Sequence, residues 1–396
     1  MKKIMILGAS MSQVPLIRAA REEGLYTIVA STPGDWPGFA QGDESSFTDI
    51  SDPEAVLREA RRHEIQGIVT CCMDAGVPAL GYVCEQMGLC GPGMNAARTA
   101  RNKFLMKEAF RKNGVSCAEH RKVTTEEELE EAIKRFGFPV AVKAVDQMGS
   151  RGIYRCDTYE EAGNCFRSIM ESSKEGYCLV EEFIEGTLFN GEAMLRNGQF
   201  VFCMTDNTEA YAAAVPTPVG HSFPFEKEKE LGEMARREMQ KAVQAVGYDN
   251  SAVDFDLLYR DGKVYVVEIN GRAGATCLPE LVSMTYQVDY YKALVKLAMG
   301  EPVAEMFRKP SANFACLSHI LSSDKEGRLL SVVNWNDESD PDIVEISVDV
   351  KPGDLVRKYT NGRDRLGQVI LKGKSLRGVK EKLEEVRRNL VFHVEG

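Results

Sequence analysis

The sequence predicts a mixed protein, with a parallel α/β domain first, an α+β region next and a strand-rich end. Three observations predict this fold class. Over the first hundred residues short apolar runs alternate with helical segments, which is typical of parallel strand–helix units. From about residue 102 the strands fall into antiparallel groups, including a hairpin at 251–272 with an Asp-Gly turn. From about residue 311 further strands follow, and the chain ends in an amphipathic helix at 375–389.

The composition is that of an ordinary folded protein and excludes several classes. The chain has 396 residues, 44% hydrophobic and 27% charged, which is enough for two or three domains. Its formal net charge of -10 argues against nonspecific binding to nucleic acid or to anionic membranes. No apolar run reaches transmembrane length, and the start is too short for a signal peptide. We therefore expect a cytoplasmic protein without a nucleic-acid or membrane partner.

Cysteine and histidine usage points the same way. The 11 cysteines are scattered, odd in number and without a Cys-x-x-Cys pair, so reduced thiols are expected instead of disulfides or a zinc site. The five histidines have no metal-ligand spacing.

The first domain, residues 1–100, is predicted from a regular alternation of elements. Strands are expected at 3–8, 26–30 and 65–70, and helices at 13–23, at 76–87 and after an N-cap signature at 51–54. The first turn, Gly8-Ala9-Ser10, is not the Gly-x-Gly-x-x-Gly of dinucleotide-binding folds. We interpret this unit as a structural domain that lends a loop to some substrate.

The later elements are expected in a different arrangement. Helices are predicted at 103–113, 124–136 and 226–246, and strands at 139–144, 178–183, 200–205, 314–321, 343–348 and 368–372. The strand at 139–144 and the one at 178–183 lie on either side of a polar, glycine-containing loop and a helix.

The hairpin carries the most informative residues. A three-residue loop at 260–262 would place Asp254 opposite Glu268, and Asn270 would share their face of the sheet. A two-residue Asp-Gly loop would instead place Asp254 opposite Ile269 and separate these groups.

Two converging carboxylates and an amide oxygen predict a cation between them, and such hard oxygen ligands suit Mg²⁺. Asp256 shares this polar face as a supporting residue or a competing ligand. A surface strand with alternating polar residues is the structural alternative. Against it, the other face is strongly apolar, with Val253, Phe255, Leu257, Val267 and Ile269.

Two lysines are candidate phosphate ligands. Lys143 ends a buried-looking strand, where an ammonium needs an anionic partner, either a nucleotide phosphate or a structural carboxylate. Lys103 lies in the first turn of a helix, where lysines are usually solvated. The neighbouring Arg98, Arg101 and Lys107 are expected to be surface charges.

The order of these features resembles the ATP-grasp superfamily from residue 1 to about residue 300. The motifs that carry the resemblance are Lys103, Lys143, Gly149-Ser150-Arg151-Gly152, Glu181-Glu182-Phe183-Ile184, the Asp254/Glu268/Asn270 set and Arg272. Each motif is weak alone, but their shared order and spacing make a strong signal. From Gly353 to Ile370 the sequence is similar to the C-terminal region of L-amino acid ligases and related carboxylate–amine ligases.

The resemblance implies a domain plan and a set of roles. It implies an N-terminal pre-ATP-grasp-like domain at 1–100, a two-lobed ATP-grasp domain at 101–310 with a mobile lobe at about 115–180, and a C-terminal α+β region at 311–396. Nucleotide-binding roles are implied for Lys103, Lys143, Gly149, Ser150, Gly152, Glu181, Phe183 and Ile184. Metal binding is implied for Asp254, Glu268 and Asn270, and catalytic roles for Arg272, Glu268 and Arg151. The implied substrate-binding residues are His221, Gly271 and Cys277.

Some of these residues have structural alternatives. Arg272 suits a carboxylate or acyl phosphate, or could form a salt bridge with Glu280 or Asp289. His221 is expected in a loop, where solvent exposure is the commoner state. Glu181 could instead belong to an edge strand with exposed glutamates.

The adenine site departs from the family pattern in one place. Its apolar walls are expected to include Val142 and Leu257. Where the family commonly has a ribose-binding glutamate, this chain has Leu188, so ribose must be held otherwise.

The function that the resemblance implies is an ATP-dependent carboxylate–amine ligase forming an amide through an acyl phosphate. ATP and Mg²⁺, or alternatively Mn²⁺, would be its cofactors, and a small carboxylic or amino acid and an amine its substrates. Two alternatives stay open: a carboxylase that forms carboxyphosphate from bicarbonate, and a non-catalytic ATP-binding protein. The resemblance is also compatible with a homodimer through the first domain.

Overall fold

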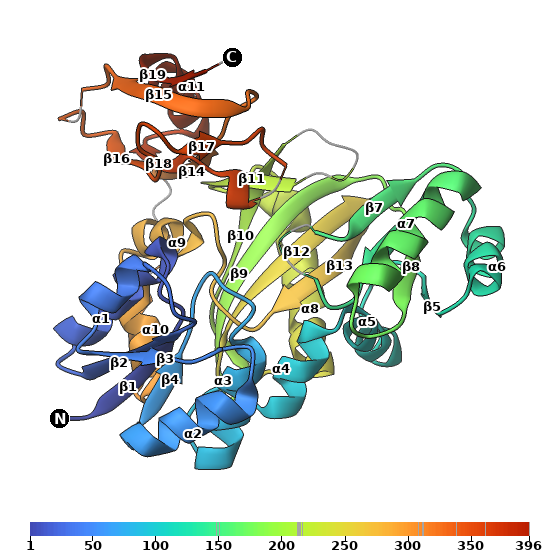
Figure 1. The fold of residues 1–396 in the computed structure, drawn as a ribbon, viewed down its shortest axis with the longest axis horizontal. Coiled ribbons are helices and arrows are strands. Elements are labelled where there is room, and N and C mark those ends of the chain that lie inside the picture. Colours follow the sequence, from blue (N-terminus) through green and yellow to red (C-terminus); the bar gives the residue numbers. More distant parts are fainter. Residues whose placement is uncertain are drawn as a thin grey trace.

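The structure is a computed structural model (Figure 1), and the residues that it describes form four sheets. It describes residues 1–147, 149, 151–211, 215, 217–307, 309–310, 313–337, 339–360 and 362–395. Among these residues no helix is long and apolar enough to cross a bilayer. All eleven cysteines are free thiols, as the sequence predicts.

The N-terminal domain is the predicted parallel α/β unit. Its sheet has the order β3-β2-β1-β4, with β1 at Lys3–Leu7, β2 at Tyr26–Ser31, β3 at Glu44–Phe47 and β4 at Gly67–Val69. Its helices are α1 (Val14–Glu22), α2 (Pro53–His63), α3 (Val77–Met87) and α4 (Met94–Arg101). Asp52 caps α2 by accepting from two backbone amides. The short, polar β3 carries no apolar alternation, so the sequence did not predict it.

A small lobe holds the second sheet, which is antiparallel with the order β5-β8-β6-β7. Its strands are β5 (His120–Val123), β6 (Val140–Ala144), β7 (Ile153–Cys156) and β8 (Cys178–Glu182). Helices α6 (Glu126–Phe136) and α7 (Tyr159–Ser172), capped by Thr125 and Thr158, pack on one face and bury it (Figure 1). The opposite, more polar face carries Lys143 and Glu181 together with the apolar Ala141, Ile153 and Leu179.

The central sheet has eight strands in the order β13-β12-β9-β10-β11-β14-β18-β16. They are β9 (Thr187–Arg196), β10 (Gln199–Tyr211), β11 (Thr217–Phe223), β12 (Ala252–Arg260), β13 (Lys263–Asn270), β14 (Ala315–Leu321), β16 (Ile343–Val348) and β18 (Gly367–Gly373). Helices α5 (Lys103–Lys112) and α8 (Glu228–Val246) cover one face of this sheet, where Val253, Phe255 and Leu257 are fully buried. The other face supplies the candidate site.

Segments far apart in the chain complete the fold. Helix α10 (Tyr290–Ala298) packs on α1 and β4 of the first domain, and α9 (Leu278–Tyr286) packs on β14. A third sheet, β17-β15-β19, combines β15 (Gly327–Asn334), β17 (Leu355–Val356) and β19 (Leu390–Val394). Helix α11 (Leu376–Asn389), the predicted amphipathic helix, is capped by Ser375 and covers the adjoining core. The strand-rich end therefore continues the central sheet.

Candidate active site

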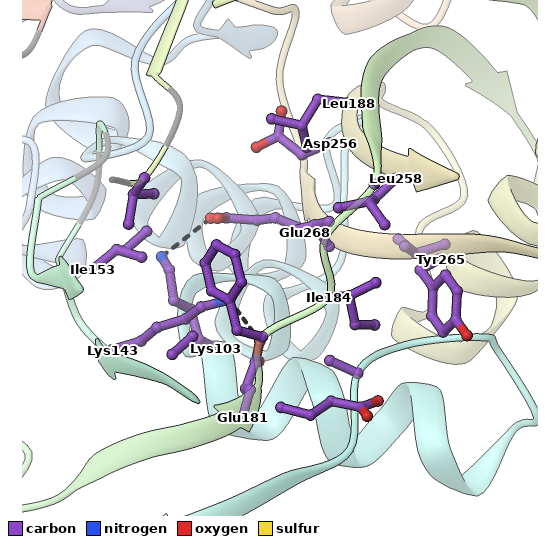
Figure 2. Close-up of a pocket in the computed structure, with 18 of the residues that line it drawn as sticks. Lys103, Lys143, Ile153, Glu181, Ile184, Leu188, Asp256, Leu258, Tyr265 and Glu268 are labelled. Atoms are coloured by element: carbon purple, nitrogen blue, oxygen red, sulfur yellow. Dashed lines mark hydrogen bonds and ion pairs between the residues drawn. The ribbon is translucent and has the colours of Figure 1, made fainter. Parts of the chain in front are cut away.

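A cavity of about 370 Å³ lies between the polar face of the small lobe and the central sheet. Figure 2 shows charged side chains from both sheets pointing into it. Its charged and polar lining residues are Lys103, Lys107, Lys143, Arg155, Glu181, Glu182, Glu185, Thr208, Asp256, Tyr265 and Glu268. Apolar side chains line the remainder, so the cavity combines an apolar slot with a charged end.

The hairpin does not have the predicted three-residue loop. Its turn is Asp261-Gly262, with φ of 49° and 78°, and Arg260 lies opposite Lys263. A bulge then shifts the register, with Val267 as the extra residue on β13. Val267 lines the cavity and does not belong to the apolar face, where the sequence analysis had placed it.

The bulge decides which carboxylates face each other. The predicted pairing of Asp254 with Glu268 is wrong: Asp256 lies opposite Glu268, and Asp254 lies opposite Asn270. The separation expected from a two-residue loop does not follow either, because the bulge returns all four side chains to one face. The predicted convergence of polar side chains is therefore present, but Asp256 and not Asp254 lies opposite Glu268.

Asp256 makes no hydrogen bond or ion pair with another residue that the structure describes. Burial raises its pKa to about 7, and the carboxylates of Asp254 and Glu268 add to the effect. In contrast, Asp254 Oδ2 accepts a 2.6 Å hydrogen bond from Arg272. Within the described ranges no three His, Cys, Asp or Glu side chains form a metal cluster. A cation here would thus rely on two carboxylates, the Asn270 amide and oxygens from substrate or water.

Both lysines predicted to bind phosphate reach the cavity. Lys103 is 5% exposed, and its Nζ lies 3.3 Å from Glu268 Oε1 and 3.0 Å from the carbonyl oxygen of Gln147. Lys143 Nζ lies 2.5 Å from Glu181 Oε2 (Figure 2). Each ammonium has a carboxylate partner at the cavity wall.

Lys107 was expected at the surface, and that expectation is wrong. It is 2% exposed, and its Nζ lies 3.5 Å from Glu181 Oε1 and 3.4 Å from the Val266 carbonyl oxygen. Its position one turn after Lys103 could have indicated a second inward lysine on the same helix face.

Each of the two predicted wall residues of the apolar slot is wrong by one position along its strand. Val142 and Leu257 point into the cores of the two sheets, whereas Ala141 and Leu258 line the cavity. Side chains alternate along a strand, so the phase is set by the core-facing residues. Leu188, in the place of the family's ribose-binding glutamate, is also a lining residue (Figure 2).

Glu181 does not belong to an edge strand. Strand β8 lies between β5 and β6, and Glu181 is 2% exposed. Burial alone would raise the pKa of Glu181, but Lys107 and Lys143 outweigh it and lower the pKa to about 2. Phe183 and Ile184 follow on the same segment and line the cavity, as does Glu185.

The glycine loop is described in part, because Ser150 lies outside the described residues. Gly149 and Gly152 have φ of 66° and 63°, the left-handed region that favours glycine. A Cβ on Gly152 would lie 2.8 Å from Cβ of Ala144, whereas one on Gly149 would meet nothing within 4 Å. The loop therefore folds back tightly onto β6 at its second glycine. Arg151 lies between them and is partly buried.

Arg272 is 7% exposed and joins two domains of the chain. Its Nε donates to Asp74 Oδ1 and its Nη1 to Asp254 Oδ2, both at 2.6 Å. The alternative salt bridges to Glu280 or Asp289 do not form. No hydrogen bond joins Arg272 Nη2 to a described residue. Arg272 does not line the 370 Å³ cavity and instead lines a second, much smaller pocket of about 30 Å³.

The three residues predicted to touch substrate have different surroundings. His221 is not in a loop: it lies in β11 and is 4% exposed. Gly271 was expected to leave room for substrate, but Tyr248 fills that space, because a Cβ on Gly271 would lie 2.3 Å from the Tyr248 hydroxyl. Burial raises the pKa of the Cys277 thiol well above its usual value, and Glu280 adds to this, so Cys277 is not an activated thiolate.

Comparison with known proteins finds two family matches, one in the middle of the chain and one near its end. Residues 102–306, just over half of the chain, match the family described as carbamoyl-phosphate synthase L chain, ATP binding domain. Residues 319–395 match L-amino acid ligase C-terminal domain 2. The solved structure of phosphoribosylglycinamide synthetase from Anaerococcus prevotii is 36% identical, with a TM-score of 0.84 over 100% of both chains.

Two further relatives are more distant. The L-amino acid ligase from Bacillus licheniformis has a TM-score of 0.84 at 17% identity, over 100% of this chain and 99% of that one. The formate-dependent phosphoribosylglycinamide formyltransferase of Methanocella arvoryzae is 22% identical over 339 residues, which are 82% of this chain and 79% of the relative.

Proposed function

The chain belongs to the ATP-grasp superfamily of ATP-dependent ligases, and from that premise we propose that it joins a small carboxylic acid to an amine through an acyl phosphate. One observation carries this proposal. Asp256 and Glu268 lie opposite each other at the charged end of a cavity that also holds Lys103 and Lys143. This is the charge pattern that a triphosphate and its cation require.

The cavity suits ATP in shape and charge. Lys103, Lys143 and the glycine loop would hold the phosphates, with Gly149, Ser150 and Gly152 allowing close backbone approach and Arg151 contributing a cation. The segment of Glu181, Phe183 and Ile184 would hold adenine against the apolar slot. Because Leu188 cannot grip ribose, Glu185 at the cavity wall is the proposed substitute.

The residues present fit a divalent cation. Asp256 and Glu268 offer opposed carboxylates, and Asp256 has no cationic partner among the described residues. Asp256, Glu268 and Asn270 would therefore hold Mg²⁺ or Mn²⁺, with Asp254 in a supporting place beside Arg272. When bound, the ion supplies neutralisation of charge on the phosphates.

The chain's own groups would position the reactants. The Nη2 group of Arg272 would orient the substrate carboxylate, and Asp74 and Asp254 hold the guanidinium in place. The carboxylate attacks the γ-phosphorus of ATP, which gives an acyl phosphate and ADP. An amine then attacks the acyl carbon and phosphate leaves. Closure of the small lobe would keep water from the acyl phosphate.

The test is ADP release from ATP and Mg²⁺ across a panel of amino acids and other small carboxylic acids, alone and in pairs, with products identified by mass. We expect ADP release that depends on an acid–amine pair and a product mass equal to their sum less one water. Release that depends on bicarbonate would favour the carboxylase alternative. ATP binding without ADP release under any mixture would favour the non-catalytic one.

A further inference from the structure

A buried histidine–carboxylate pair lies on the site face of the central sheet. His221 Nδ1 on β11 is 2.8 Å from Oδ1 of Asp206 on β10, and Asp206 is fully buried. Asn190 Nδ2 donates to the other carboxylate oxygen of Asp206 at 3.4 Å. Held in this way, Asp206 accepts the Nδ1–H of the imidazole, which fixes the ring orientation and tautomer.

The pair belongs to a polar row that starts at the proposed cation site. Glu268 lies opposite Asp256, Asp256 opposite Asn190, and Asn190 opposite Asp206. Directly opposed residues share one face of a sheet, so these side chains form a row across β13, β12, β9 and β10. His221 lies beside the end of this row, opposite Thr208, which lines the cavity.

The second nitrogen of His221 is free of protein partners within the described ranges. No hydrogen bond to its Nε2 is found, although the ring is almost fully buried. Glu192, an acid on the same face, is engaged: it accepts from the Tyr290 hydroxyl at 2.7 Å and from the Gly274 amide at 3.0 Å. A buried imidazole with one nitrogen fixed and the other open has the geometry of a general base.

The electrostatic surroundings suit that role. Burial would lower the pKa of His221, but the facing carboxylates of Asp206, Asp254 and Asp256 outweigh it and raise the pKa above its usual value. A raised pKa makes the neutral imidazole a stronger base, which favours proton transfer from the amine.

We infer that His221 accepts the proton of the attacking amine and that Asp206 positions it, an inference that rests on the proposed ligase reaction. The amine nitrogen forms a bond to the acyl carbon, and its N–H proton passes to His221 Nε2. The bond between the acyl carbon and the phosphate oxygen then breaks, and phosphate leaves with the electron pair. The imidazolium returns its proton to phosphate or to water, which leaves the amide and the neutral base.

The experiment compares two nucleophiles on the full-length protein. Each of the twenty proteinogenic L-amino acids is offered as the acid with ATP and Mg²⁺, first with hydroxylamine and then with a second amino acid, ammonia or methylamine. Hydroxylamine is uncharged at neutral pH and captures acyl phosphates without a catalytic base, so hydroxamate reports the first step. The amide product, measured by mass, reports both steps.

In His221→Gln we expect amide formation to fall about 10²- to 10⁴-fold and hydroxamate formation to fall less than about tenfold. Wild-type amide formation should rise with pH as His221 loses its proton, and that limb should vanish in His221→Gln. Asp206→Asn should shift the limb to lower pH, because a lost anion lowers the pKa of the imidazole. His319→Gln is the matched control: His319 lies opposite Gly220 on the adjoining β14, out of phase with His221, and should leave both rates unchanged.

Equal losses of hydroxamate and amide in His221→Gln would overturn the inference, since a structural or phosphate-binding role would affect both. Unchanged amide formation would overturn it as well. If the wild type gives hydroxamate but the pH limb persists in His221→Gln, the base is another group. Failure of the wild type to give hydroxamate with any of these amino acids, or with the other small carboxylic acids of the panel used for ADP release, would instead overturn the proposed ligase reaction, and this inference with it.

Discussion

At the scale of single residues, the two aspartates of β12 have different neighbours, although the sequence analysis predicted only Asp254 as a cation ligand. Asp254 is tied to Arg272 at 2.6 Å, whereas Asp256 faces Glu268 without a cationic partner among the described residues. Residue type and spacing do not distinguish them, because both lie on the same face two positions apart. Their neighbours do, and the assignment can therefore be tested by mutation.

We predict that Asp256→Asn and Glu268→Gln each reduce ADP formation at least about 10²-fold, because each removes an oxygen anion from the cation site. Both should also raise the Mg²⁺ concentration needed for half-maximal rate. Asp254→Asn should leave that Mg²⁺ requirement unchanged and raise the KM for the acid substrate, since it frees Arg272. A Mg²⁺ titration of initial rates separates the two patterns. The assignment would be reversed if Asp254→Asn alone shifted the Mg²⁺ requirement.

The buried Glu181 makes a prediction about stability and pH. Lys107 and Lys143 lower its pKa from the usual 4.5 to about 2, so the unfolded state binds this proton first. Its contribution to stability is fully present above pH 4.5 and is lost as the pH falls towards 2. We expect the free energy of unfolding at pH 7 to be about 3–5 kcal/mol lower for Glu181→Gln than for the wild type, because two buried ammonium groups lose their anion.

Urea unfolding of wild type and Glu181→Gln at several pH values between 7 and 2.5 measures this. The difference between the two proteins should shrink towards the acid end of the series. A constant difference across the series would mean that folding does not lower the pKa of Glu181, because only a pKa difference between the folded and unfolded states makes stability depend on pH.

At the scale of elements, the hairpin shows where prediction from sequence succeeds and stops. The alternation of residues 252–270 predicted two strands with one apolar and one polar face, and the structure confirms both. The register could not be predicted, because it depends on a two-residue turn and on a bulge at Val267 that compensate each other. A bulge leaves no mark in composition or periodicity, so the sequence could not show that the partner of Asp254 is Asn270, two residues beyond Glu268.

The glycine loop gives a paired test of backbone geometry. Gly149 and Gly152 have nearly the same left-handed φ, but a side chain at Gly152 would press on Ala144 and Gln147, whereas Gly149 is open. Both alanine substitutions cost about 1–2 kcal/mol, because a residue with a Cβ is strained in the left-handed conformation. Only Gly152→Ala must also move the loop away from β6, whose Ala144 amide donates to the Gly152 carbonyl oxygen at 2.7 Å.

We therefore predict that Gly152→Ala raises the KM for ATP at least about tenfold, and that Gly149→Ala changes it by less than about threefold, since about 1.4 kcal/mol corresponds to tenfold. Initial rates against ATP concentration measure both. Equal effects would show that the φ penalty, and not the fit of the loop against β6, governs nucleotide binding.

At the scale of the whole molecule, the fold class could be predicted, with a parallel sheet first and antiparallel strands after it, but the pairing of distant strands in one sheet could not. Alternating elements predicted the parallel first domain, and the helix Thr124–Phe136 was predicted almost to the residue. Pairing of β11 with β14 joins Gly220 to His319 across about a hundred residues, and such contacts follow from packing, not from local pattern. The contact of Arg272 with Asp74 could not be predicted for the same reason.

This pairing predicts that the strand-rich end cannot be removed at its sequence boundary. Strands β14, β18 and β16 extend the central sheet beyond β11, and Cys316 and Ile370 are buried against Cys277 and Leu281. In a fragment of residues 1–310, β11 would lose its pairing with β14 and become an exposed edge strand. The apolar surface next to it would also be exposed. The truncation would also remove Ser318, whose Oγ accepts from the His221 amide at 3.3 Å.

We expect the 1–310 fragment to bind a hydrophobic dye, to lose its cooperative thermal transition and to form no ADP. A fragment of residues 1–389, which removes only β19 of the separate three-stranded sheet and the residues after it, is the control. It should keep a cooperative transition, because β15 retains its pairing with β17 and the eight-stranded sheet stays whole. Calorimetry and size-exclusion chromatography of both fragments decide the matter. A monomeric 1–310 fragment with the transition temperature of the full chain would show that the central sheet is complete without its last three strands, and that the site needs nothing beyond residue 310.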